Sequence, residues 1–438
     1  MGERLFGTDG IRGVANADLT PELAFGLARA TGESLDGPVL IGRDTRRSGP
    51  MLAAALQAGF NAVGVDTIDV GVLPIGGVSR LTRTGEATLG VMVSASHNPA
   101  PDNGIKLIGG NGNKLPDADE DAVEARFRSG EPYPAPVGSD VGGASVMTDA
   151  LGRYLDLLTG DNGVPLGGMS VVLDCAHGAA YRAAPELFRR LGAEVEVHGA
   201  DPDGLNINDG CGAMHPEALV PLARGRLGLC FDGDADRLIA IDEDGVVANG
   251  DVIMAVLAGH MKAAGRLDGH RVVATVMANL GFKHAMTALG IDVLETAVGD
   301  RYVLEAMERS RAALGGEQSG HIVLEDRVSG DGLRSALRLV EVMASTGAEL
   351  RELRKVMTEF PQVLRNVVVA HKARLAEADA VWSAVRAAET ALGADGRVLV
   401  RASGTEPLVR VMVEAPTSDI ADEVARSISR VVVAALGA

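Results

Sequence analysis

The 438-residue sequence has only three cysteines, few aromatic residues and no long apolar run. Cys175, Cys211 and Cys230 form no C-x-x-C motif, and their odd number argues against a disulfide framework and a zinc site. No segment reaches the roughly 18 apolar residues of a membrane helix, and the N-terminus lacks the apolar region of a signal peptide. We therefore expect a cytoplasmic protein with no membrane partner.

Basic residues are in the minority, because 41 Lys and Arg stand against 59 Asp and Glu, for a net charge of −18. A surface with this charge repels nucleic-acid phosphates, so no nucleic-acid partner is expected. If the substrate is itself an anion, the protein must gather cations locally against its overall field. Isolated arginines and lysines in glycine-rich loops are therefore of interest.

An apolar run, a glycine-containing loop and a helical pattern follow one another at 39–60, 170–191 and 271–289. Strands that alternate with helices predict the α/β class with parallel or mixed sheets. Gly192 and Gly290 close two of these helices and lie 290 − 192 = 98 residues apart. This spacing indicates similar domains in tandem.

The C-terminal part has a different pattern, with strands expected at 397–401 and 408–414 and a helix at 419–436. It predicts a smaller α+β domain. The expected domains are 1–150, 151–250, 251–365 and 366–438.

Three aspartates recur at every second position in one loop between two apolar runs. They are Asp232, Asp234 and Asp236. Their mutual repulsion favours a hard cation, and oxygen ligands suit Mg²⁺ or Ca²⁺. An EF-hand is disfavoured because Arg237 replaces the required glycine and the flanks 227–231 and 238–241 predict strands. A Mg²⁺ site is favoured over a plain acidic turn, and Mg²⁺ usually completes its shell with water or a substrate phosphate.

A second loop, Val-Ser-Ala-Ser-His-Asn-Pro, follows the apolar run that ends at Val93. Ser96 beside His97 fits an activated nucleophile, but such residues also satisfy their own backbone in turns. Taken alone, this motif favours the turn.

Further loops carry isolated cations and small polar residues. Phe-Gly-Thr-Asp-Gly-Ile-Arg-Gly contains Arg12, and Gly-Ile-Lys contains Lys106. The segment 401–410 combines hydroxyl and glycine residues with two arginines, which is typical of a phosphate-binding nest and also of an ordinary hairpin. Glu317 and Ser319 lie in Gly-Glu-Gln-Ser-Gly-His, which is suited to sugar hydroxyls. No serine-hydrolase elbow, Rossmann fingerprint or P-loop is present.

Together, the motifs FGTDGIRG, SASHNP, DGDADR, GEQSGH and RASGTEP resemble those of the α-D-phosphohexomutases, in the same order along the chain. The resemblance implies four domains around a central cleft, the first three with one α/β topology. It also implies one Mg²⁺ per active site and a sugar bisphosphate as activator and intermediate. The most similar members interconvert glucosamine 6-phosphate and glucosamine 1-phosphate for cell-wall precursor synthesis.

The resemblance also implies residue roles. Ser96 is the expected phosphoserine, which binds Mg²⁺ together with the three aspartates. The residues expected to assist transfer are Arg12, Lys106 and Arg237. The residues expected to hold the sugar phosphate are His97, Glu317, Ser319, Arg401, Ser403, Gly404, Thr405 and Arg410.

Several alternatives stay open at this point. A glucose or mannose phosphate is an alternative substrate, because nothing in the motifs identifies a group that reads the C2 amine. A phosphatase with Asp232 as nucleophile would leave two of the motifs unused, and a non-catalytic sensor would need no phosphoserine. The bisphosphate has to turn around between half-reactions, so hinge motion near residue 366 is expected. The oligomeric state stays open.

Overall fold

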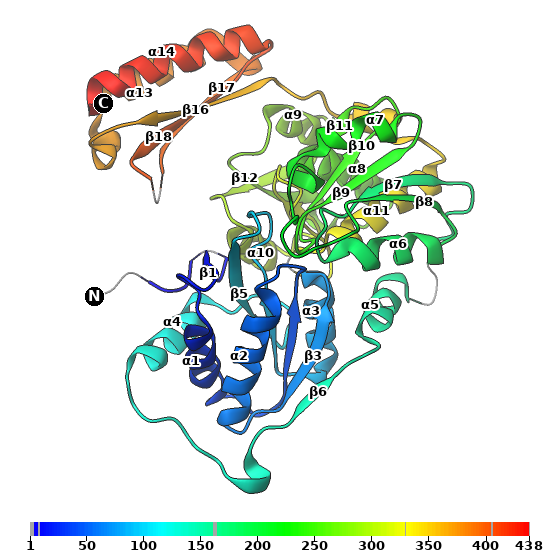
Figure 1. Ribbon diagram of the computed structural model, residues 1–438. Coiled ribbons are helices and arrows are strands. Elements are labelled where there is room, and N and C mark those ends of the chain that lie inside the picture. The colour runs from blue at the N-terminus through cyan, green and yellow to red at the C-terminus, as the bar shows by residue number, and fades with distance from the viewer. Residues whose placement is uncertain (1–3, 8, 161–163, 329, 404–405, 438) are drawn as a thin grey trace. The chain divides into compact units, whose positions relative to one another are not determined.

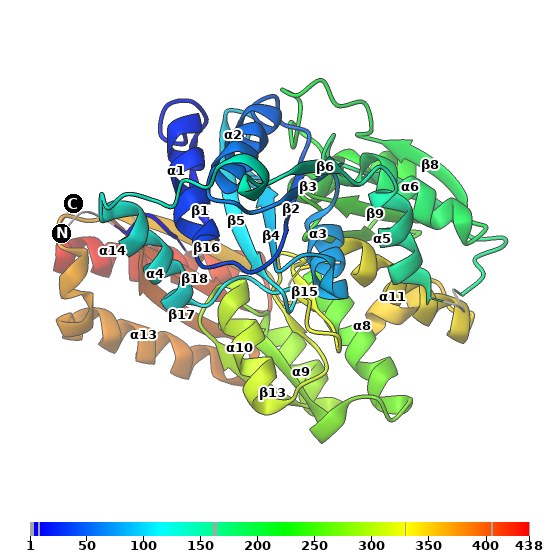
Figure 2. The ribbon, with the colours of Figure 1, turned by 90° about the horizontal axis from the view of Figure 1, so that it is seen from below.

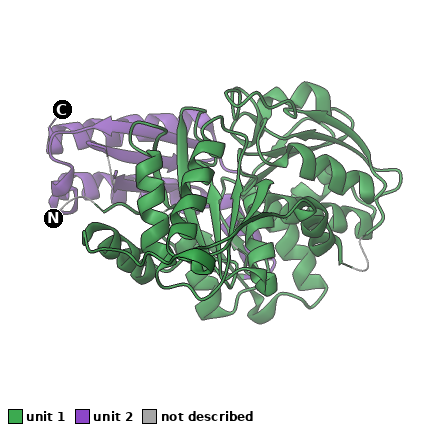
Figure 3. Cartoon of the chain, turned by 60° about the horizontal axis from the view of Figure 1, so that its bottom comes forward, with its two compact units in different colours: residues 1–277, 292–355 green, residues 278–291, 356–438 purple. Residues whose placement is uncertain are grey.

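The computed structural model of the chain describes residues 4–7, 9–160, 164–328, 330–403 and 406–437 (Figure 1). The chain folds into two compact units, which comprise residues 1–277 with 292–355 and residues 278–291 with 356–438 (Figure 3). Among the described helices, none combines the length and apolarity needed to cross a bilayer.

The first sheet has six strands in the order β1-β5-β4-β2-β3-β6 (Figure 2). Its strands are β1 Ile11–Val14, β2 Val39–Arg43, β3 Thr67–Val72, β4 Leu89–Val93, β5 Asp102–Gly109 and β6 Ala144–Val146. The accompanying helices are α1 Pro21–Gly32, α2 Gly49–Ala62, α3 Ile75–Leu81 and α4 Asp117–Arg128. β4 is buried on both faces: Leu89 and Val91 join the core beside α1 and α2, whereas a Cβ at Gly90 would meet Val78 of α3 at 3.3 Å. This explains the continuous apolar run of β4.

The second and third sheets have the orders β11-β10-β9-β7-β8 and β13-β12-β14-β15. The strands of the second are β7 Ser170–Asp174, β8 Glu194–His198, β9 Leu227–Phe231, β10 Leu238–Ile241 and β11 Val247–Ala248. Those of the third are β12 Arg271–Thr275, β13 Asp292–Thr296, β14 Gly315–Gly316 and β15 Ile322–Val323. The other helices of this unit are α5 Ala150–Thr159, α6 Ala180–Arg190, α7 Val220–Ala223, α8 Gly250–Ala263, α10 Asp300–Ser310, α11 Gly332–Thr346 and α12 Leu350–Leu353.

The three sheets share one arrangement of four strands, namely β3-β2-β4-β5, β8-β7-β9-β10 and β13-β12-β14-β15. In each, the first three strands are parallel and the fourth is antiparallel to the third. The loop between the third and fourth strands carries a polar motif every time: SASHNP, DGDADR or EQSGH. The predicted α/β fold with mixed sheets and one repeated topology is confirmed.

Buried polar contacts around Asp331, the N-cap of α11, join three helices of the first unit. Its carboxylate accepts hydrogen bonds from Tyr154 Oη of α5 (2.8 Å), Arg80 Nε of α3 (2.7 Å) and the Arg334 backbone N–H (3.0 Å). The helices α3 and α11 then contact the DGDADR loop, because Ile75 N donates to Asp234 O and Gly332 N to Ala235 O. These hydrogen bonds around Asp331, here called the Asp331 brace, therefore support the DGDADR loop through α3 and α11.

The second unit contains a three-stranded antiparallel sheet in the order β16-β18-β17. Its elements are α9 Leu280–Ala288, β16 Gln362–Val368, α13 Asp379–Leu392, β17 Arg397–Ala402, β18 Leu408–Glu414 and α14 Ser418–Leu436. The helices α13 and α14 lie along one face of the sheet and enclose an aliphatic core with it (Figure 1). On the other face, Leu364 and Val368 of β16 are exposed. The predicted smaller α+β domain is confirmed.

Candidate active site

The three aspartates of the DGDADR loop form a buried carboxylate cluster. They connect β9 to β10, so the flanks are strands and the EF-hand alternative fails. One oxygen from each of Asp232, Asp234 and Asp236 lies within 4.8 Å of the others. Within the described chain, buried Asp234 Oδ1 has no hydrogen-bond partner. Converging anionic oxygens, one of them buried without a donor, fit a hard divalent cation such as Mg²⁺.

The pKa shifts in this cluster reflect its burial and charge. Burial raises the pKa of Asp232 well above its usual value, and the charges of Asp236 and Asp234 raise it further. Burial also acts on Asp236, but a hydrogen bond from His321 and the charge of Lys106 outweigh it and lower the pKa of this carboxyl. The shift of Asp232 reflects three carboxylates buried close together, an arrangement that favours a bound cation.

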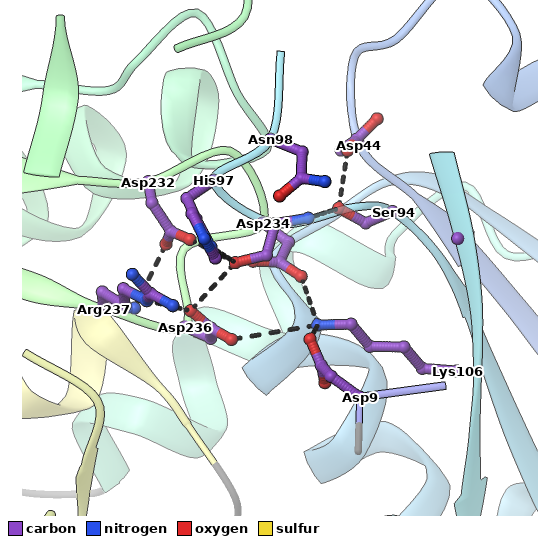
Figure 4. Close-up of polar contacts among 12 residues, drawn as sticks. Asp9, Asp44, Ser94, His97, Asn98, Lys106, Asp232, Asp234, Asp236 and Arg237 are labelled. Carbon is purple, nitrogen blue, oxygen red and sulfur yellow. Dashed lines mark hydrogen bonds and ion pairs between the residues drawn. The ribbon is translucent and has the colours of Figure 1, made fainter. Parts of the chain in front are cut away.

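Ser96 lies directly beside this cluster, whose three aspartates Figure 4 shows. It follows β4, is 1% exposed and has a positive φ of 51°. Its Oγ donates a hydrogen bond to Asp232 Oδ2 at 2.6 Å, and His97 Nδ1 is 3.4 Å away. The structure therefore brings the predicted phosphoserine and the predicted metal ligands together across two domains.

The cations expected to assist transfer also lie at this place. Lys106 Nζ of β5 is 2.9 Å from Asp234 Oδ2 and 3.2 Å from Asp9 Oδ2. Burial opposes its charge, but the aspartates prevail and raise the pKa of Lys106. The Arg237 backbone N–H donates to Asp232 Oδ1 at 3.2 Å. Arg12 of β1 pairs with Asp9 and is 3.3 Å from the Asn98 side-chain oxygen.

Four further charged or titratable side chains lie at the site, although the sequence analysis gave them no role. Lys114 bridges the carboxylates of Asp9 and Asp300. His321 lies between Asp236 and Asp300, at 3.6 and 3.8 Å. Asp9 and His321 belong to quoted motifs, which was a usable signal. Lys114 lies in the loop before α4 and Asp300 begins α10; neither belongs to a motif, and the two meet only through the fold.

Two of the residues expected to hold the sugar, Glu317 and Ser319, lie on the loop between β14 and β15. Glu317 Oε1 accepts a hydrogen bond from Gly299 N at 3.1 Å, and the buried Ser319 Oγ has no partner within the described ranges. This loop adjoins the carboxylate cluster, because Leu238 N donates to Gly320 O at 3.0 Å. Burial and the charge of Arg237 lower the pKa of His97 to about 4, so its ring is neutral near pH 7.

The residues expected to hold a distal phosphate lie on the β17–β18 hairpin of the second unit. Arg401 and Arg410 are cross-strand partners. Burial and the charge of Arg410 lower the pKa of Arg401, as expected for two adjacent cations. Ser403 is 7% exposed, and its Oγ accepts from Glu406 N at 3.3 Å. Gly404 and Thr405 lie outside the described residues.

Comparison with family models gives a match to each of four consecutive domains. They are described as phosphoglucomutase/phosphomannomutase α/β/α domain I (residues 3–134), domain II (153–245), domain III (249–360) and the C-terminal domain (364–431). The predicted boundaries at 150, 250 and 366 stay predictions.

Comparison with curated proteins gives relatives named phosphoglucosamine mutase. The relative from Desulforudis audaxviator is 50% identical, and the match covers 98% of this chain and 97% of the relative. The relative from Mycolicibacterium paratuberculosis is also 50% identical, and the match covers 99% of this chain and 99% of the relative. A solved putative phosphomannomutase of Thermus thermophilus is 25% identical, with a TM-score of 0.75 and coverage of 98% and 100%. A solved N-acetylphosphoglucosamine mutase of Aspergillus fumigatus, in complex with GlcNAc-6P and magnesium, is 20% identical with a TM-score of 0.70, covers 98% and 96%, and shares the fold.

Proposed function

Because the chain belongs to the phosphoglucomutase/phosphomannomutase family, we propose that it is a phosphoglucosamine mutase, which interconverts glucosamine 6-phosphate and glucosamine 1-phosphate through phosphorylated Ser96. The observation that carries the proposal is the buried Ser96 Oγ, 2.6 Å from Asp232 in the carboxylate cluster. The choice of the amino sugar is supported by relatives of that name at 50% identity over almost the whole chain.

In the first half-reaction, a hydroxyl of the sugar phosphate attacks the phosphorus of phosphoserine 96. The bond from phosphorus to Ser96 Oγ breaks, and the hydroxyl proton ends on Oγ. The product is a sugar bisphosphate, which turns around and returns its other phosphoryl group to Ser96.

Charge neutralisation is the main task of the surrounding side chains. Phosphoserine brings about −1.5 to −2 charges next to three aspartates. The aspartates and the phosphate would hold Mg²⁺, which offsets part of this charge and polarises the phosphoryl oxygens. Lys106, Arg12 and Arg237, whose Nε is 3.7 Å from Asp236 Oδ1, supply the further positive charge that the transferred group needs.

The other end of the substrate is assigned by the same proposal. Glu317, Ser319 and His97 hold the sugar, and the β17–β18 hairpin holds the distal phosphate. The hairpin residues proposed for this are Arg401, Ser403, Gly404, Thr405 and Arg410. The proposal also includes a sugar bisphosphate activator, a cytoplasmic location and a place in cell-wall precursor synthesis.

The testing experiment compares kcat/KM for glucosamine, glucose and mannose 6-phosphates, with Mg²⁺ and a trace of glucose 1,6-bisphosphate. A strong preference for the amino sugar is expected. Preference for glucose or mannose phosphate would overturn the substrate assignment alone. Turnover of none of the three would overturn the mutase assignment.

Ser96→Ala tests the nucleophile directly. The variant should lose transfer but still bind glucosamine 6-phosphate, and its intact mass should lack the added phosphate of the wild type. Full activity of Ser96→Ala would rule out this serine. Asp232→Asn separates the phosphatase alternative, because retained phosphorylation of Ser96 in that variant would argue against Asp232 as the phosphorylated residue.

A further inference from the structure

Arg46 is a fully buried arginine directly behind the Ser96 loop, and its side chain has 0% exposure. It uses all five guanidinium N–H donors. Nε donates to Asp44 Oδ2, and the two terminal nitrogens donate to the carbonyls of Ser96, Asn98, Pro99 and Asp102. None of these carbonyls belongs to a helix, and the guanidinium thus satisfies the inner side of an irregular turn.

Asp44 and Ser94 continue this network to the backbone of Ser96. Ser94 Oγ donates to Asp44 Oδ2 at 2.6 Å (Figure 4). It also accepts a hydrogen bond from the Ser96 backbone N–H at 2.9 Å. Asp44 and Ser94 are 1% and 0% exposed, so water does not replace either contact. The Ser96 N–H and carbonyl are therefore both held from the same side, by Ser94 and by Arg46.

The second domain completes the support of the loop. Asn208 Nδ2 donates to the carbonyls of Ser96 and Asn98, at 2.9 and 3.1 Å. Arg47, next to Arg46, donates its backbone N–H to Gly204 O at 3.0 Å. The segment 44–47 thus fixes the Ser96 loop and also contacts the domain that supplies Asp232.

We propose that Arg46, Asp44 and Ser94 are positioning residues that hold Ser96 in its left-handed conformation with Oγ aimed at Asp232, so that they govern phosphoryl transfer and not sugar-phosphate binding. This proposal rests on the proposed mutase function. Positive φ is a strained conformation for a non-glycine residue, and these contacts hold Ser96 in it. None of the three side chains has to touch the substrate.

The test uses the full-length protein with Ser94→Ala, Asp44→Asn and the double variant. We expect kcat for glucosamine 6-phosphate to fall on the order of tenfold to a hundredfold, while KM changes by less than about twofold. The double variant should lose little more than either single variant, because both break the same chain of hydrogen bonds. Arg46→Lys, which keeps the charge but not the planar fork, should also lower kcat.

The matched control is Thr31→Ala, which removes another buried hydroxyl, bonded to Leu27 O at 2.9 Å in α1. It should reduce stability similarly but leave kcat unchanged. The proposal is overturned if Ser94→Ala and Asp44→Asn have the same kcat as this control. It is also overturned if the effects of the two substitutions on kcat are fully additive in the double variant. A fall in kcat that is no larger than the fall in the fraction of folded protein would overturn it too. A wild type without mutase turnover would overturn the proposed function as well, whereas failure of the positioning proposal alone shows only in the variants.

Discussion

Ser96 and Gly233 approach each other more closely than side chains allow. Ser96 has a φ of 51°, and its carbonyl points at Gly233, where a Cβ would lie 2.4 Å from that oxygen and 2.9 Å from Asn208 Nδ2. The Ser96 carbonyl oxygen accepts two hydrogen bonds, one from Arg46 and one from Asn208 Nδ2, so it cannot move aside cheaply. The second residue of DGDADR is therefore glycine for a steric reason, and the contact sets the separation of Ser96 from the carboxylates.

Gly233→Ala should therefore push the two loops apart. We expect it to lower the free energy of unfolding by about 1 to 3 kcal/mol, as overpacking does, and to lower kcat more than KM changes. Denaturant unfolding measures the free energy of unfolding, and steady-state kinetics measures kcat and KM. Gly152→Ala is the control, because a Cβ in α5 meets nothing within 4 Å and should stabilise by about 0.5 to 1 kcal/mol. Equal behaviour of the two variants would contradict the steric argument.

The sequence predicts individual site residues where local chemistry is unusual. Three alternating aspartates after an apolar run indicate a cation site without any knowledge of the fold. By contrast, the positive φ of Ser96 has no local signal, because it depends on contacts from distant residues. Arg46 was missed for the same reason: its partners are mostly carbonyl oxygens, which every residue has.

At the scale of elements, the same loop of the shared strand arrangement carries a polar motif in each of the three sheets. The loops after β4, β9 and β14 each join the third strand of the shared arrangement to the fourth. The sequence predicted this in part, since two of these motifs follow recognisable apolar strands. β14 and β15 have only two residues each, too few for a periodic pattern, and so the position of EQSGH could not be predicted.

The Asp331 brace, which joins α3, α5 and α11, leads to a prediction about stability at alkaline pH. Burial raises the pKa of the Tyr154 hydroxyl well above its usual 10.0, and the charge of Asp331 raises it further. Below about pH 10 both states are protonated, so the hydrogen bond contributes fully. At higher pH only the unfolded phenol ionises, so the free energy of unfolding falls by up to about 1.4 kcal/mol per pH unit.

Tyr154→Phe removes both the hydrogen bond and this slope. The variant should be less stable at pH 7 by about 1.5 to 3 kcal/mol, because the partner is a buried carboxylate. The difference from wild type should narrow as the pH rises from about 9 to about 11. Urea unfolding at several pH values measures it, with Tyr181→Phe, at a half-buried tyrosine of α6, as control. If the difference in free energy of unfolding between Tyr154→Phe and wild type did not change with pH, the raised pKa of the buried Tyr154 hydroxyl would be contradicted.

At the scale of the whole molecule, cations gather at one place although the overall charge is negative. The chain carries −18 overall, yet Arg12, Lys106 and Lys114 are drawn to one place in its first unit. They are held there by Asp9 and by the carboxylate cluster. The composition therefore excluded nucleic acid as an expected partner but could not show how an anionic substrate is tolerated, since that depends on which side chains the fold brings together.

The two compact units are not continuous segments of the sequence. α9 lies between β12 and β13 along the chain, but it belongs to the compact unit of residues 278–291 and 356–438. Its periodic pattern predicts a helix but not what the helix packs against. Asn279 makes this connection: Oδ1 accepts from Gly281 N and Phe360 N, and Nδ2 donates to Phe360 O, each at 2.9 Å.

Asn279→Ala should loosen α9 and the segment around residue 360 together. The lost cap and the lost backbone contacts should cost about 1 to 3 kcal/mol of local stability. Hydrogen exchange read by mass spectrometry should show faster exchange at 278–291 and 356–361, with β9 unchanged. Asn249→Ala, which removes the side chain that caps α8 through Asp251 N and Val252 N, should accelerate α8 only. If Asn279→Ala accelerated α9 without residues 356–361, Asn279 would be an ordinary cap and would not join the two segments.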